Sequence, residues 1–118
     1  MKAYIDTNIY DYVALRHPTY GKACKRILSD VRSGRLDAYG SLLVAVEILG
    51  SLARISSRIS AGAVTAFFSL PVRIIPMDQI VLRNALTIMV ETEVSYDSVH
   101  ASLMERAKVT TIITEDQE

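Results

Sequence analysis

Four acidic residues, spread along the 118-residue chain, have the type and placement to do chemistry: Asp6, Glu47, Asp97 and Asp116. Glu47 lies within an apolar run, where a buried carboxylate is costly unless it is paired or binds a metal. Asp6 and Asp116 each follow a predicted strand, and Asp97 opens a predicted helix. Each acid also has an ordinary interpretation as a helix cap, a turn residue or part of an exposed helix face. Only their joint placement therefore predicts a site.

Carboxylates grouped without cysteine or histidine favour a hard cation such as Mg²⁺ or Mn²⁺. Such an ion lowers the pKa of a bound water and stabilises charge at a phosphorus centre, so this set of residues favours metal-assisted phosphodiester hydrolysis. The chain has no P-loop and no GxGxxG motif, and its two histidines, His17 and His100, lack metal-ligand spacing. His100 follows Asp97 by three residues and could face the same cleft, although a packed or surface role is commoner for a histidine.

Composition predicts a single domain over residues 1–118, since half of the residues are hydrophobic and can form a core. The single cysteine, Cys24, allows no internal disulfide. The start of the chain lacks a signal-peptide core, and the longest uncharged stretch, residues 59–72, is too short to span a membrane. We therefore expect a cytoplasmic protein with no membrane segment.

The formal net charge is zero, so any binding of nucleic acid must use a local basic patch. Five basic residues in one region could contact phosphates or form a solvated helix face: Lys22, Lys25, Arg26, Arg32 and Arg35.

Short apolar runs alternate with helical patterns along the chain. We expect strands at residues 2–6, 36–39, 72–75 and 109–114. We expect helices at residues 18–33, 42–57, 59–70, 78–90 and 97–107, with Ser41 and Asp78 as caps. This alternation predicts an α/β fold with a parallel sheet, whose ligands bind at the carboxyl ends of the strands.

These residues resemble the motifs of the PIN-domain ribonucleases, in particular the small VapC-type toxins of toxin–antitoxin pairs. Residues 4–8 (YIDTN) are similar to the family's first strand and first catalytic acid. Residues 41–50, 96–101 and 113–116 are similar to the segments that carry the second, third and fourth acids. The four segments occur in the family's order over nearly the whole chain.

The resemblance implies a three-layer PIN-like fold, with a central parallel sheet flanked by helices, and a Mg²⁺- or Mn²⁺-dependent endoribonuclease. It implies that the four acids are the catalytic and metal-binding residues, and that Thr7 and Thr114 support them by hydrogen bonding. It also implies an RNA substrate, a small antitoxin partner and a homodimer. The sequence ends two residues after Asp116, where the family continues with a helix and an edge strand, so we expect either a truncated C-terminus or a minimal member of the family.

Two other functions stay open. The first is a catalytically inactive PIN-like module for binding or assembly. The second is a phosphoacceptor or phosphatase-like domain with Asp6 as nucleophile, although the sequence offers no convincing lysine near that site. Nuclease activity that requires Mn²⁺ and vanishes with EDTA would separate the ribonuclease from the inactive module.

Overall fold

The protein is described by a computed structural model that covers residues 1–115 of the 118, apart from the side chain of Tyr96. Residues 116–118, and with them the predicted site residue Asp116, lie outside the described part. The elements of residues 1–115 follow one another in this order: β1 (Lys2–Ile5), α1 (Thr7–Ala14), α2 (Gly21–Arg32), β2 (Asp37–Gly40), α3 (Leu42–Ala53), α4 (Ser57–Ser69), β3 (Arg73–Ile74), α5 (Gln79–Thr92), α6 (Tyr96–Ala107) and β4 (Ile112–Ile113).

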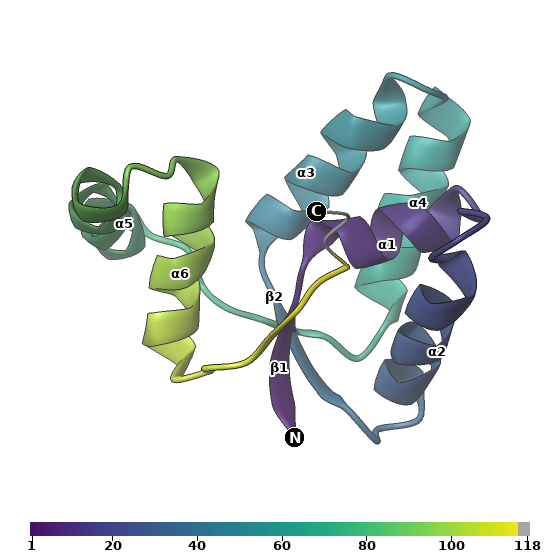
Figure 1. Cartoon of the computed structure of the whole chain (residues 1–118), viewed down its shortest axis with the longest axis horizontal. Coiled ribbons are helices and arrows are strands. Elements are labelled where there is room, and N and C mark those ends of the chain that lie inside the picture. Colours follow the sequence, from purple (N-terminus) through teal and green to yellow (C-terminus); the bar gives the residue numbers. More distant parts are fainter. Residues whose placement is uncertain (116–118) are drawn as a thin grey trace.

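The described strands form one parallel sheet in the order β3-β2-β1-β4. The chain moves outward from β1 through β2 to β3 and then returns to the opposite side of β1, where β4 pairs with Tyr4 and Ile5. Ligands bind where strand order reverses in this way, so the expected crevice lies at the carboxyl ends of β1 and β4. Figure 1 shows the α5–α6 pair on one side of the sheet and α1 to α4 on the other. The predicted α/β fold with a parallel sheet between helices is therefore confirmed.

The core forms around β1, whose residues Ala3, Tyr4 and Ile5 are fully buried. A central parallel strand is covered by helices on both faces, which explains its nearly continuous run of apolar residues. The α3 helix packs on this core through Val44 and Ile48, which are one helical turn apart. Within residues 1–115, no helix is both long enough and apolar enough to cross a membrane.

Two helix starts agree with the sequence and four differ from it. The α2 and α4 helices begin at Gly21 and Ser57, whereas residues 18 and 59 were predicted. Ser41 and Asp78 cap α3 and α5 through their side chains, as predicted. The α1 helix, which begins after Asp6, was not predicted. The α6 helix begins at Tyr96 after Ser95, so Asp97 lies in the first turn and is not the cap.

The last two strands are shorter than residues 72–75 and 109–114, the ranges predicted for them, because each is paired over only two residues.

Candidate active site

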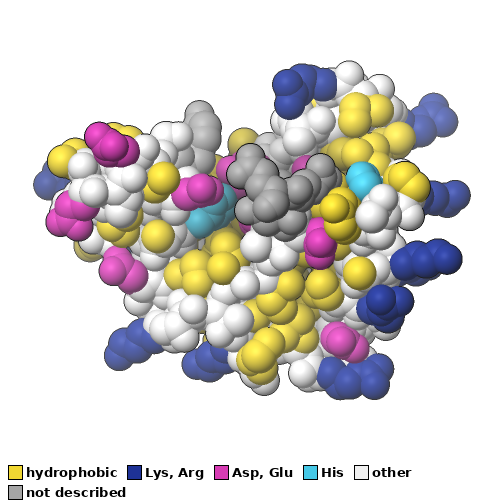
Figure 2. Space-filling model, viewed as in Figure 1, with side chains coloured by type: hydrophobic (Ala, Val, Ile, Leu, Met, Phe, Trp, Pro, Cys, Tyr) yellow, Lys and Arg dark blue, Asp and Glu magenta, His cyan; other side chains and the backbone are white. Residues whose placement is uncertain are grey.

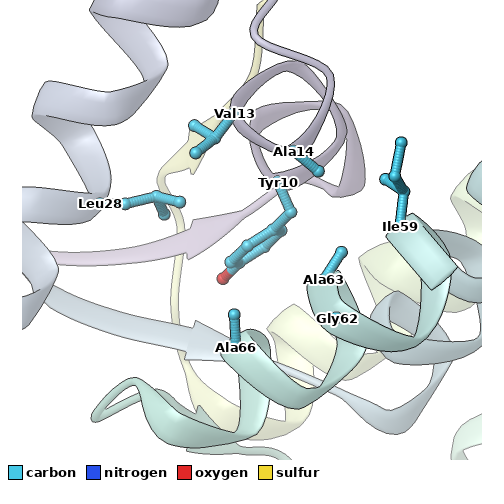
Figure 3. A pocket seen from close by; sticks show the side chains of 8 residues that line it. All are labelled: Tyr10, Val13, Ala14, Leu28, Ile59, Gly62, Ala63 and Ala66. Carbon is cyan, nitrogen blue, oxygen red and sulfur yellow. The ribbon is translucent and has the colours of Figure 1, made fainter.

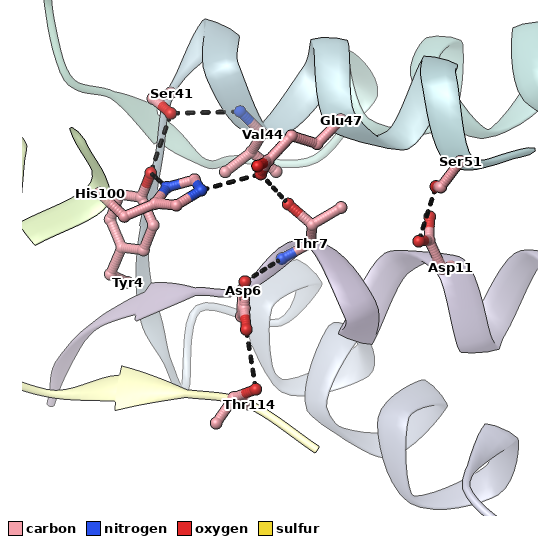
Figure 4. Close-up of polar contacts among 10 residues, drawn as sticks. All are labelled: Tyr4, Asp6, Thr7, Asp11, Ser41, Val44, Glu47, Ser51, His100 and Thr114. Atoms are coloured by element: carbon pink, nitrogen blue, oxygen red, sulfur yellow. Dashed lines mark hydrogen bonds and ion pairs between the residues drawn. The ribbon is translucent and has the colours of Figure 1, made fainter. Parts of the chain in front are cut away.

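Asp6 lies directly after β1, at the reversal of strand order, and its carboxylate is fixed by two hydrogen bonds. Its Oδ1 accepts from the backbone N–H of Thr7 at 2.8 Å, which caps α1. Its Oδ2 accepts from the hydroxyl of Thr114, just after β4, at 2.8 Å. Asp6 is therefore both a helix cap and an oriented acid that is tied to two neighbouring strands (Figure 4).

Glu47 extends from α3 toward the start of α1, and its side chain is 28% exposed. Its Oε1 accepts two hydrogen bonds, from the hydroxyl of Thr7 at 2.7 Å and from Nε2 of His100 at 2.8 Å. Thr7 thus contacts both acids, Asp6 through its backbone and Glu47 through its side chain. The structure brings these two predicted site residues together with Thr7 between them (Figure 4).

Among the described residues, no arginine or lysine side chain balances the charge of this pair. In the part of the chain that the structure describes, the ion pairs made by arginine involve neither Asp6 nor Glu47, and lysine makes none. Burial alone would raise the pKa of Glu47, but the hydrogen bonds from His100 and Thr7 outweigh burial and hold its pKa below the usual value. Glu47 is therefore a carboxylate at neutral pH.

Asp97 is not brought into contact with the first pair. Asp97 is exposed in the first turn of α6 and makes no hydrogen bond or ion pair with a described residue. Asp116 lies outside residues 1–115. Over that range, no three side chains of His, Cys, Asp or Glu lie close enough together to hold a metal ion. The roles of Asp97 and Asp116 therefore stay predictions.

His100 contacts the site, although a packed or surface role was the commoner expectation from the sequence. It lies one helical turn after Asp97, is nearly buried, and bonds directly to Glu47. The hydroxyl of Tyr4 bonds its other ring nitrogen at 2.7 Å. The spacing of three residues between Asp97 and His100 was the available signal, because residues so spaced share one face of a helix.

Asn8 is a second contact that was not predicted. Its Nδ2 donates to the backbone carbonyl of Glu115 at 2.9 Å and to the hydroxyl of Thr114 at 3.1 Å. The hydroxyl of Thr114 therefore accepts from Asn8 and donates to Asp6, so the segment after β4 is held against the start of α1.

A hollow of about 310 Å³ lies between α1, α2 and α4, away from the acids. Figure 3 shows Tyr10 pointing from α1 into the space beside Leu28 and Ala66. The lining side chains are almost entirely apolar and include no acid or base: Tyr10, Val13, Ala14, Leu28, Ile59, Gly62, Ala63 and Ala66. This hollow therefore offers none of the chemistry expected of the acidic site.

One face of the molecule carries charged side chains of both signs around its edge and acidic side chains near its centre (Figure 2). Figure 2 shows Lys and Arg side chains around the edge of this face, with acidic and histidine side chains also near its centre. A polyanion could contact the Lys and Arg side chains at the edge. The acids near the centre would repel it unless a cation were bound there.

Comparison with known proteins identifies the family. The family model of the PIN domain matches residues 3–118, so the chain belongs to the PIN domain family. Among solved structures, it is similar to VapC20 of Mycobacterium tuberculosis, described as a toxin that cleaves the sarcin–ricin loop. That match has a TM-score of 0.80 at 17% identity and covers 97% of this chain and 89% of that chain.

A second similar structure is VapBC2 of Rickettsia felis bound to a DNA fragment from its promoter. That match has a TM-score of 0.68 at 17% identity and covers 98% of this chain and 88% of the matched chain. No curated protein matches this chain by sequence. At this level of identity, the two likenesses show that the fold is shared.

Proposed function

We propose that this PIN-domain protein is a metal-dependent endoribonuclease, of the VapC toxin type, that hydrolyses RNA phosphodiester bonds. The observation that carries the proposal is the pair of Asp6 and Glu47, joined by Thr7 at the reversal of strand order. Membership of the PIN family and the fold shared with VapC20 support the same conclusion.

The type of residue at the site fits a hard cation, because among the described residues no arginine or lysine side chain pairs with its carboxylate oxygens. Asp6 and Glu47 would hold Mg²⁺ or Mn²⁺, and Asp97 and Asp116 would complete the set of ligands. A bound ion supplies an activated water and stabilises charge on phosphorus. Thr7 and Thr114 orient the two carboxylates, so the protein fixes these groups before the ion arrives.

The partners follow from the family and from one surface feature. We infer that a small antitoxin blocks the site, since a similar structure is a VapBC complex. We also infer a homodimer, which is supported by large apolar side chains exposed on α5, such as Ile80 at 70% and Val90 at 77%. We place the protein in the cytoplasm, where an RNA substrate is found.

The test of the proposed function is RNA cleavage with Mn²⁺ by wild type and by charge-neutral variants. Asp6→Asn and Glu47→Gln should each lower cleavage on the order of a hundredfold or more, since each removes a charge that holds the ion. Asp97→Asn and Asp116→Asn should also lower it. The matched control is Asp37→Asn. Asp37 lies opposite Lys2 where β1 and β2 begin, at the end of the sheet away from the site.

Circular dichroism of each variant checks that the fold is kept. Full cleavage by the Asp6 and Glu47 variants would refute the assignment. A wild type that cleaves no RNA with Mn²⁺, yet binds an antitoxin, would favour the inactive module. A trapped phosphoaspartate at Asp6 would favour the phosphoacceptor.

A further inference from the structure

A chain of hydrogen bonds runs through the interior behind Glu47. Nε2 of His100 lies 2.8 Å from Oε1 of Glu47, and Nδ1 of His100 lies 2.7 Å from the hydroxyl of Tyr4. The same hydroxyl lies 2.9 Å from Oγ of Ser41, which in turn accepts from the backbone N–H of Val44 at 3.3 Å. Figure 4 shows these contacts converging from β1, α3 and α6. We call this series the Ser41–Glu47 chain.

The members of the Ser41–Glu47 chain have little access to water. Tyr4 and Ser41 are fully buried, and the side chain of His100 is 7% exposed. A buried polar hydrogen without an acceptor destabilises the fold, because it has lost its hydrogen bond to water and gained none in the protein. Each hydroxyl or ring N–H of the chain therefore needs a partner within the protein.

This requirement fixes the direction of every bond. The Glu47 carboxylate can only accept, so Nε2 of His100 carries a hydrogen and donates it. In a neutral ring Nδ1 then accepts from the hydroxyl of Tyr4. Burial raises the pKa of the Tyr4 hydroxyl, so this group keeps the proton that it donates.

The remaining bonds follow in the same direction. The oxygen of Tyr4 accepts from the hydroxyl of Ser41, whose own oxygen accepts from the N–H of Val44. If His100 carried hydrogens on both nitrogens, the bonds to Tyr4 and Ser41 would reverse. The Ser41 hydroxyl would then have no acceptor among the described residues. The neutral ring with hydrogen on Nε2 is thus the form in which every polar hydrogen of the Ser41–Glu47 chain has an acceptor.

We propose that His100 is a positioning residue, held by Tyr4 and Ser41 as the neutral Nε2–H tautomer, that fixes Glu47 for cation binding. His100 and Thr7 both bond Oε1 of Glu47, and no described residue bonds Oε2. Oε2 is therefore the oxygen that stays available to a cation. This inference rests on the proposed metal-dependent function, since it assigns Glu47 as a ligand.

The first test reads the tautomer directly, without metal or RNA. Protein labelled with ¹⁵N-histidine should show His100 with hydrogen on Nε2 and an unprotonated Nδ1, and His17→Gln assigns the two histidine signals. Tyr4→Phe should change the Nδ1 signal of His100, because the hydroxyl that donates to it is gone. A ring with hydrogen on Nδ1 in the wild type would overturn the inference.

The second test measures Mn²⁺ binding by titration calorimetry. His100→Ala should weaken binding about tenfold to a hundredfold, as loss of a group that orients a metal ligand does elsewhere. His100→Gln should restore most of the affinity, because its amide nitrogen can donate from nearly the place of Nε2. Tyr4→Phe should weaken binding less than His100→Ala, and it keeps the test available if the alanine variant does not fold.

The matched control is Ser102→Ala. Ser102 is buried on the same helix and donates to the carbonyl of Val81 at 2.8 Å, but it touches neither Asp6 nor Glu47. Its replacement should leave Mn²⁺ affinity unchanged. Equal losses of Mn²⁺ affinity in the Ser102 and His100 variants would overturn this inference but not the proposed function. A His100→Ala variant that binds Mn²⁺ as well as wild type would do the same. A wild type that binds no Mn²⁺ would overturn the proposed function as well.

Discussion

Asp11 is the acid through which we expect pH to act on the stability of this protein. Its Oδ2 accepts from the hydroxyl of Ser51 at 2.8 Å, whereas its Oδ1 is buried without a partner in the described part of the chain. Burial raises the pKa of Asp11 from 3.8 to about 6; the bond from Ser51 offsets part of this rise, and the charges of Glu47 and Asp6 add to it. Folding therefore strengthens the binding of a proton to Asp11.

Asp11→Asn should stabilise the protein near neutral pH and have less effect in acid. The pKa of Asp11 is higher in the folded state, so its protonation stabilises the fold below about pH 4, and this contribution is lost as pH rises through about 6. The neutral amide avoids the loss. Because the carboxyl is only half-buried and solvent screens it, we expect a gain of about 1 kcal/mol above pH 7.

Urea unfolding of both proteins at about pH 4 and above pH 7 measures this difference. An effect of the same size at both pH values would show that deprotonation of Asp11 is not its cause.

The sequence predicts single residues of the site better than it predicts their contacts. Asp6 could be placed because it follows an apolar run that becomes β1. The contact between Glu47 and His100 joins positions 53 residues apart and depends on how α3 and α6 approach each other. No local pattern encodes that approach, so the bond could not be derived from the spacing of residues.

At the scale of elements, α1 shows where local patterns are insufficient. It has eight residues, which is too few for a helix to be stable alone or to show a clear periodicity. It forms because Ile9 and Tyr10 are buried in the core and because Asp6 caps its start. The starts of α3 and α5 were predictable because Ser41 and Asp78 are good capping residues directly before helical patterns.

Ser41→Ala should destabilise the fold more than the equivalent change at another cap. Ser56 caps α4 by accepting from the N–H of Ile59 at 3.2 Å, and its loss should cost about 1 kcal/mol. Ser41 caps α3 in the same way, but it is fully buried and also bonds Tyr4. We therefore expect Ser41→Ala to cost about 2 kcal/mol, measured by denaturant unfolding. Equal costs for the two variants would show that the Tyr4 bond adds no stability.

At the scale of the whole molecule, a zero net charge conceals a local group of acids at the site. In Figure 2, Lys and Arg side chains lie around the edge of the face, whereas acidic side chains lie both at its edge and near its centre. Clustered carboxylates repel one another, and a cation that binds only the folded protein offsets this repulsion. Binding of metal should therefore be visible as stability of the entire fold, independently of any RNA.

Mn²⁺ should raise the melting temperature of the wild type. A concentration a hundredfold above the dissociation constant would stabilise the fold by about 2.7 kcal/mol, which is roughly ten degrees for a domain of this size. Asp6→Asn and Glu47→Gln should lose most of this shift, because each removes one charged ligand. Asp37→Asn should keep it, since Asp37 lies at the other end of the sheet.

Differential scanning calorimetry at constant ionic strength separates specific binding from screening by salt. Without metal, Asp6→Asn should melt close to the wild type, because losing its repulsion with Glu47 offsets losing a charged acceptor for Thr7 and Thr114. An unchanged melting temperature of the wild type in Mn²⁺ would contradict a cation site built on Asp6 and Glu47. A shift that persists in both variants would place the bound ion elsewhere in the protein.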